Sequence, residues 1–144
     1  MATQATMSIR DFAVQNVDRL LTSLVFALHQ AARTKDPDSI HDLRVGVRRF
    51  TQSLLIFGEF FPAAEVKRIR RGLKKLMRLS SEVRNRDIAL EFLSTQEQPS
   101  AAREALVERL TRERSNCEEE FTALLERWRG HEFSARWRAA LLLR

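Results

Sequence analysis

Apolar residues recur at intervals of three and four along nearly the whole chain, and this spacing places them on one face of an α-helix. The pattern predicts six helical segments, over about residues 8–35, 39–60, 63–79, 82–96, 101–129 and 134–143. No segment alternates between apolar and polar residues as a half-buried strand does. Long segments with short connections predict one all-α domain over residues 1–144, an antiparallel helical bundle of about five to six helices.

Local signals mark the boundaries between these segments. Pro37 cannot continue the first helix, and Asp38 or Ser39 is placed to cap the second. The pair Ser80 and Ser81 predicts a short joint between the third and fourth segments.

Composition narrows the class of protein. The chain has four glycines, three prolines and a single cysteine, Cys117. One cysteine excludes an intramolecular disulfide and is typical of a reducing compartment. No apolar run approaches the roughly 18 residues of a membrane-spanning helix, and the first residues lack the pattern of a signal peptide. We therefore expect a cytoplasmic protein with no membrane partner.

The positive charge is concentrated in one part of the chain. The formal net charge is +6, from 25 lysines and arginines against 19 aspartates and glutamates. Residues 41–86 alone contain twelve basic and four acidic residues, a balance of +8, whereas the remainder has thirteen and fifteen, a balance of −2. A local basic field of this kind indicates a polyanionic partner.

Two neighbouring helical faces carry this charge. On a helical wheel of the segment 39–60, His41, Arg44 and Arg48 form one stripe at the border of the apolar face, while Arg49 points further from the core. The segment 63–79 presents a broad cationic face, which two more arginines extend. The residues of this second group are Lys67, Arg68, Arg71, Lys74, Lys75, Arg78, Arg84 and Arg86.

A run of basic residues is often no more than a solvated helix face. Here, however, like charges at i, i+3 and i+4 repel one another. A face chosen for solubility alone would interleave glutamates, as Glu104 and Glu108 do in the segment 101–129. His41 shares its stripe with two arginines, which fits a phosphate contact better than a metal ligand. These observations favour a polyanion site.

Three stretches of the chain resemble the CHAD domains, an all-helical family named for its histidines. The family's His-x-x-Arg-Val-x-x-Arg-Arg pattern is matched within "IHDLRVGVRRF" by His41, Arg44, Val45, Arg48 and Arg49. The stretch "LKKLMRLSSEVRNRDIALEFL" has Arg84 and Asp87 where a second, weaker motif of the family has an arginine and an aspartate. The closing "GHEFSARWRAALLL" is similar to the end of a family half-unit, so the resemblance spans nearly the whole chain.

The resemblance implies a bundle like one half of a CHAD domain that binds inorganic polyphosphate through a basic surface or pore. It implies no catalysis by the domain itself and no cofactor or metal. The anion contacts that it implies are His41, Arg44, Arg48 and Arg49. The basic neighbours that would complete the polyphosphate site are Arg71, Lys74, Lys75, Arg78 and Arg84. An association with polyphosphate granules would follow.

The chain also departs from the family pattern. Thr51 stands where a further arginine is common, Ser81 where a glycine is usual, and Asn85 where the second motif has its first aspartate. Members of the family usually carry two helical half-units, whereas this chain has one. Either the chain is a fragment, or two copies pair about a two-fold axis to rebuild the two-part unit, and we expect this homodimer.

The final helical segment is the expected dimer surface. Phe133, Trp137, Leu141 and Leu142 make it more apolar than a short terminal helix requires, and exposed apolar patches often bind partners. The alternative is that this helix folds back and covers its own bundle.

Other functions would use the same residues differently. A nucleic-acid-binding protein would use the same basic field, but it should expose aromatic residues among the cations, and most phenylalanines lie on apolar stripes. An enzyme acting on phosphates would usually hold Mg²⁺ between clustered carboxylates. Asp42 and Asp87 are isolated and are interpreted as salt-bridge partners of arginines, and Cys117 as a core residue. A purely structural interaction domain is the remaining alternative.

Overall fold

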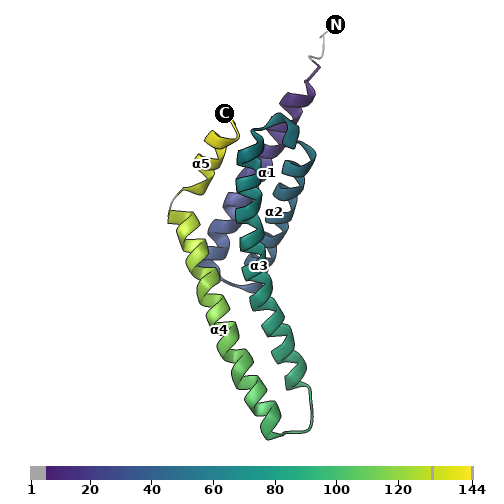
Figure 1. Cartoon of the computed structure of the whole chain (residues 1–144), viewed down its shortest axis with the longest axis vertical. Coiled ribbons are helices and arrows are strands. Elements are labelled where there is room, and N and C mark those ends of the chain that lie inside the picture. Colours follow the sequence, from purple (N-terminus) through teal and green to yellow (C-terminus); the bar gives the residue numbers. More distant parts are fainter. Residues whose placement is uncertain (1–5, 131, 144) are drawn as a thin grey trace.

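The structure is a computed structural model that describes residues 6–130 and 132–143, and these residues form helices and no strands. Five α-helices follow one another: α1 (Ile9–Thr34), α2 (Pro37–Ile56), α3 (Ala63–Ser94), α4 (Ala101–Gly130) and α5 (Phe133–Ala140). A short 3-10 helix, Gly58–Phe60, lies between α2 and α3. The arrangement in Figure 1 confirms the predicted all-α bundle.

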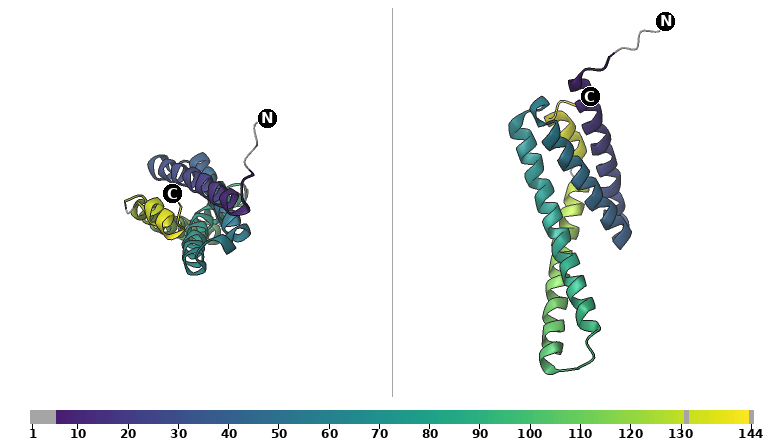
Figure 2. Two further views of the ribbon diagram at one scale, coloured as in Figure 1. Left: turned by 90° about the horizontal axis from the view of Figure 1, so that it is seen from above. Right: turned by 90° about the vertical axis from the view of Figure 1, so that its right-hand side faces the viewer.

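The molecule consists of a bundle and an arm. The helices α1 and α2 pack against each other, beside the first half of α3 and the second half of α4 (Figures 1 and 2). The other halves of α3 and α4 extend beyond this bundle as a two-helix arm. The largest fully buried side chains are Phe50, Leu21, Leu24, Leu28, Leu43, Leu54, Ile69, Leu73, Leu76, Leu125, Leu141 and Val17. The core therefore takes residues from all five helices or their flanks.

The ends of α1 lie where the sequence predicts them. The Ser8 hydroxyl accepts a hydrogen bond from the backbone N–H of Asp11, which satisfies a donor in the first turn. At the other end Lys35 has a left-handed backbone, with φ of 55°, and its N–H donates to the carbonyl of Ala31. Ile9, the first residue of the helix, is apolar but 71% exposed.

The start of α2 differs from the prediction by two residues. Asp36 is the capping residue, and its carboxylate accepts a hydrogen bond of 2.7 Å from the backbone N–H of Ser39. Pro37, expected only to interrupt the preceding helix, begins the next one. A proline fits this position because its missing N–H would have no partner in the first turn.

A single unbroken helix, α3, replaces the two helices predicted on either side of Ser80 and Ser81. Ser80 is 4% exposed, and its hydroxyl donates to the carbonyl of Met77 at 2.9 Å. A serine can return its hydroxyl hydrogen to the preceding helical turn in this way without ending the helix. The prediction of a joint was therefore wrong: one continuous helix carries both the basic residues 67–84 and the α3 half of the arm.

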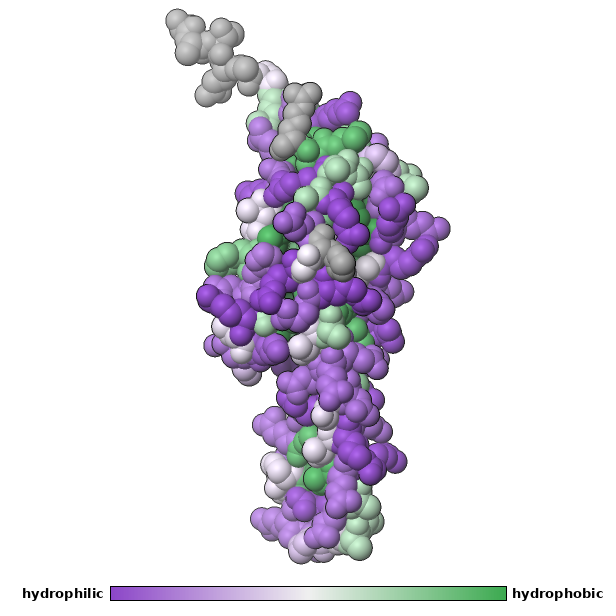
Figure 3. Space-filling view, turned by 90° about the vertical axis from the view of Figure 1, so that its left-hand side faces the viewer, coloured by the Kyte–Doolittle hydropathy of each residue, from purple (hydrophilic) through white to green (hydrophobic). Residues whose placement is uncertain are grey.

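The last helix, α5, folds back onto its own bundle. Phe133 is 2% exposed and Leu141 is 1% exposed, and Trp137 contacts the rings of Phe50 and Trp128. Leu142 is exposed, beyond the end of the helix. The apolar surface predicted for a dimer is thus mostly covered by the chain itself. Figure 3 shows that the outer face on this side is largely hydrophilic, with apolar side chains in separate patches.

None of the described helices is long and apolar enough to cross a lipid bilayer.

Candidate polyanion-binding groove

A basic groove runs between α2 and α3. Its lining residues are Val47, Arg48, Thr51, Gln52, Lys67, Arg70, Arg71, Leu73, Lys74 and Met77, around a volume of about 560 Å³. Five of these side chains are cationic, and none is a carboxylate. Val47 and Leu73 are each 1% exposed, so they belong to the core that joins the two helices. Long lysine and arginine side chains can cover such an apolar floor with their aliphatic stems while their charged heads reach water.

An outer concavity on α3 continues the basic groove. It is lined by Arg71, Lys74, Lys75, Met77, Arg78 and Ser81. Arg71, Lys74 and Met77 belong to both hollows, so the two are contiguous. From Lys67 to Arg84 the cations follow α3 over about 25 Å, at 1.5 Å of rise per residue. The arrangement is suited to an extended anion.

Arg44 of α2 is half-buried beside this surface without a carboxylate partner among the described residues. Its Nη1 atom donates to the hydroxyls of Ser80 and Ser81, at 2.8 and 3.0 Å. Burial lowers the pKa of the Arg44 guanidinium, and the positive charges of Arg48 and Arg84 lower that pKa further. The hydroxyls hold the side chain in place but leave its charge uncompensated.

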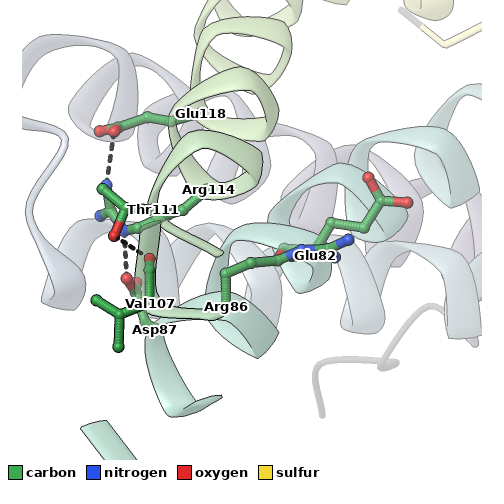
Figure 4. A network of polar contacts seen from close by, with 7 residues as sticks. All are labelled: Glu82, Arg86, Asp87, Val107, Thr111, Arg114 and Glu118. Carbon is green, nitrogen blue, oxygen red and sulfur yellow. Dashed lines mark hydrogen bonds and ion pairs between the residues drawn. The ribbon is translucent and has the colours of Figure 1, made fainter. Parts of the chain in front are cut away.

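The acids that could neutralise α3 lie mainly toward α4. Arg114 of α4 pairs with Asp87 and Glu118 (Figure 4). Arg86 of α3 pairs with Glu113 of α4 at 3.4 Å. Among the described residues no ion pair within 4.0 Å reaches Arg44, Arg84 or the cationic residues of the basic groove. The cations toward α4 hold the arm together, whereas those toward α2 remain available for an external anion.

The structure brings most of the predicted site residues together. Arg48, Arg71 and Lys74 line the basic groove, and Arg71, Lys74, Lys75 and Arg78 line the outer concavity. The positive charge of Arg84 is close enough to Arg44 to lower the pKa of the Arg44 guanidinium.

Three predicted site residues either lie outside the two hollows or are partly neutralised. His41 and Arg49 are exposed on α2 and line neither hollow. The cause for Arg49 is its direction on α2, already visible on the helical wheel. Arg78 is partly neutralised, because its guanidinium lies 3.7 Å from the Glu82 carboxylate.

Four polar residues of the groove, Thr51, Gln52, Lys67 and Arg70, were not among the predicted site residues. Arg70 follows Lys67 by three positions and precedes Lys74 by four, and this spacing puts the three side chains on one side of α3. The spacing was a usable signal for Arg70. For Gln52 the sequence offers no comparable signal, since its role depends on which side of α2 faces α3.

The remaining candidate residues fall outside the groove. Asp87 pairs with an arginine as predicted, whereas Asp42 is exposed and makes no ion pair with a described residue. Cys117 is half-buried at the α3–α4 contact, 3.8 Å from a carboxylate oxygen of Glu82. In the described part of the chain, no three histidine, cysteine or acidic residues gather as a metal site would require.

Comparison with known proteins gives one family. No curated protein and no solved structure matches the chain. The family model described as the CHAD domain matches residues 9–144, nearly the whole chain, so the protein belongs to the CHAD domain family.

Proposed function

We propose that this protein binds inorganic polyphosphate in the basic groove and the outer concavity, without catalysing a reaction. The observation that carries the proposal is the uneven pairing of charge on α3. The basic groove has five cations and no carboxylate, while the neighbouring α3–α4 contact has its arginines paired with acids. Unpaired like charges held side by side repel, and a bound polyanion would relieve that repulsion.

The chemistry of the side chains suits phosphate. Arginine can bind two oxygens of one phosphate with two parallel N–H donors, and such charge-assisted hydrogen bonds are stronger than neutral ones. Lys67 and Lys74 add point charges at the same surface. A linear chain of phosphates would meet these groups repeatedly along α3. The association of the CHAD family with polyphosphate also supports this ligand.

Nucleic acid is the competing polyanion. Nonspecific single-strand binding usually combines a basic track with aromatic side chains that stack on bases. The exposed aromatic residue of α3 is Phe92, which is 63% exposed. It lies eight residues beyond Arg84, about 12 Å along the helix. Because Phe92 is not interleaved with the cations of the groove, the proposal favours polyphosphate.

A competition experiment tests the proposal. Labelled polyphosphate of defined length is bound to the protein and then displaced by unlabelled polyphosphate, single-stranded DNA or RNA at matched phosphate concentration. Polyphosphate should displace best, raise the melting temperature most and bind more weakly as salt increases. Equal or stronger displacement by nucleic acid would replace the proposed ligand with that polymer.

The homodimer stays a prediction, but the apolar face of α5 that was expected to form its interface is mostly buried within the single chain. Phe133 and Leu141 belong to the core of the single chain. A dimer would therefore have to form elsewhere, and two cationic faces would approach each other more easily with polyphosphate between them. Light scattering with and without polyphosphate tests this point. A monomer in both conditions at high micromolar concentration would remove the dimer and leave the groove intact.

A further inference from the structure

Ser81 lies at the junction between Arg44 and the outer concavity. Its hydroxyl accepts a hydrogen bond of 3.0 Å from Nη1 of Arg44, and the same side chain lines the concavity together with Arg71 and Lys74. Ser81 is partly exposed, whereas its neighbour Ser80 is 4% exposed and lines neither hollow. The two adjacent serines therefore have different surroundings although both accept from the same arginine.

The hydroxyls of Ser80 and Ser81 also differ in whether their own hydrogen has an acceptor. A serine hydroxyl has one hydrogen to donate and two lone pairs to accept with. Ser80 accepts from Arg44 and donates to the carbonyl of Met77, so its hydrogen is already used. Ser81 accepts from Arg44, but its own hydrogen has no acceptor among the described residues. Ser81 thus presents an unused donor at a cationic surface.

We propose that Ser81 is a direct ligand contact, which donates its hydroxyl hydrogen to a phosphate oxygen bound in the outer concavity. The inference rests on the proposed function and names one more residue of the same site. Accepting from a guanidinium polarises the hydroxyl and makes it a better donor, because hydrogen bonds in a chain strengthen one another. Arg44 therefore has two roles, as a charge beside the anion and as the group that holds the Ser81 oxygen in place. Ser80, one residue earlier, would then act as a positioning residue for Arg44 and not as a contact.

Ser81→Ala and Ser80→Ala form a matched pair that tests the inference. Each removes one hydroxyl that accepts from Arg44, neither changes the charge, and alanine is the best helix-forming residue. Affinity for polyphosphate of defined length is measured at several salt concentrations for the wild type and both variants. Ser81→Ala should weaken binding by about three- to tenfold, the range expected for losing one hydrogen bond of ordinary net strength. Ser80→Ala should weaken it by less than about twofold, and Ser81→Thr, which keeps a hydroxyl, should restore most of the affinity.

The salt dependence adds a readout that a merely structural role would not produce. Because Ser81→Ala removes a neutral contact, the plot of log affinity against log salt should shift without changing slope. Equal losses in the two alanine variants would mean that the serines only position Arg44, and they would overturn the proposed contact. Unchanged affinity in Ser81→Ala would overturn it as well. If the wild type itself fails to bind polyphosphate, the proposed function fails, which is a separate and recognisable outcome.

Discussion

The rings of Phe50 and Trp137 are stacked, with centroids 5.9 Å apart and planes that differ by 8°. Phe50 follows directly after the two arginines at positions 48 and 49, so one turn of α2 holds basic residues outside and the stacked ring inside. Trp137 belongs to α5, close to the end of the chain. This contact fixes α5 against the core beneath the basic helix, and it explains why the apolar face of α5 is not available to a partner.

Trp137→Ala should therefore destabilise the folded chain. Truncating a large aromatic side chain in a packed cluster usually costs about 3–5 kcal/mol, and the partial exposure of Trp137 puts the expected loss nearer 2–3 kcal/mol. Urea denaturation measures the free energy of unfolding. Arg136→Ala, an exposed neighbour in the same helix, should stay within about 0.5 kcal/mol of the wild type. Unchanged unfolding in Trp137→Ala together with altered self-association would restore the dimer surface.

The double variant Arg44→Ala, Arg48→Ala should lose polyphosphate affinity. The matched control is Arg112→Ala, Arg127→Ala, since both of these arginines are exposed on α4, outside the groove and the described ion pairs. Each double variant removes two positive charges. The variant without Arg44 and Arg48 should bind at least about tenfold more weakly, with a salt slope smaller by about two, as expected when two positive charges beside the phosphates are lost. Similar losses in both variants would show that binding depends on net charge and not on this groove.

Gly72→Ala should stabilise α3 without affecting the ligand. A Cβ atom at this position would lie 3.5 Å from Cζ2 of Trp128, which is ordinary van der Waals contact. Glycine within a helix is less stable than alanine by about 0.5–1 kcal/mol, so the free energy of unfolding should rise by up to this amount. Gly72 does not line the basic groove, and polyphosphate affinity should stay the same. A lower stability would mean that Trp128 cannot accommodate the added methyl group.

The Cys117 thiol should ionise only above the usual pH range of a free cysteine. Burial is the main cause of its raised pKa, while Arg86 lowers that pKa and Glu82 raises it. Because the thiolate is the reactive form, the midpoint of the pH profile for alkylation should lie above the ordinary value of about 8.5. Glu82→Gln removes a negative charge and should move the midpoint down, whereas Arg86→Ala should move it up. A midpoint equal to that of an exposed cysteine peptide would contradict this description of the site.

The sequence alone determined the local features of this protein. The three- and four-residue spacing of apolar residues predicted the helices, because a helical face is formed by residues close together in the chain. The same short-range logic placed Arg44 and Arg48 on one stripe of α2 and concentrated the charge within residues 41–86. Local signals failed where a residue type is compatible with two different local structures. Serines at positions 80 and 81 can interrupt a helix or bond back into it, and the sequence does not show which.

Packing between helices settles which charges are paired and which surfaces are covered. Arginines look alike in the sequence, but Arg86 of α3 pairs with Glu113 of α4, while Arg48 of α2 lines a groove without carboxylates. The link from Arg44 to the serines of α3 spans 36 and 37 residues, and no local pattern encodes it. The apolar face of α5 was visible in the sequence, but burial depends on which other helix lies opposite. Helical periodicity shows which side of a helix is apolar, whereas packing in three dimensions selects the partner of that side.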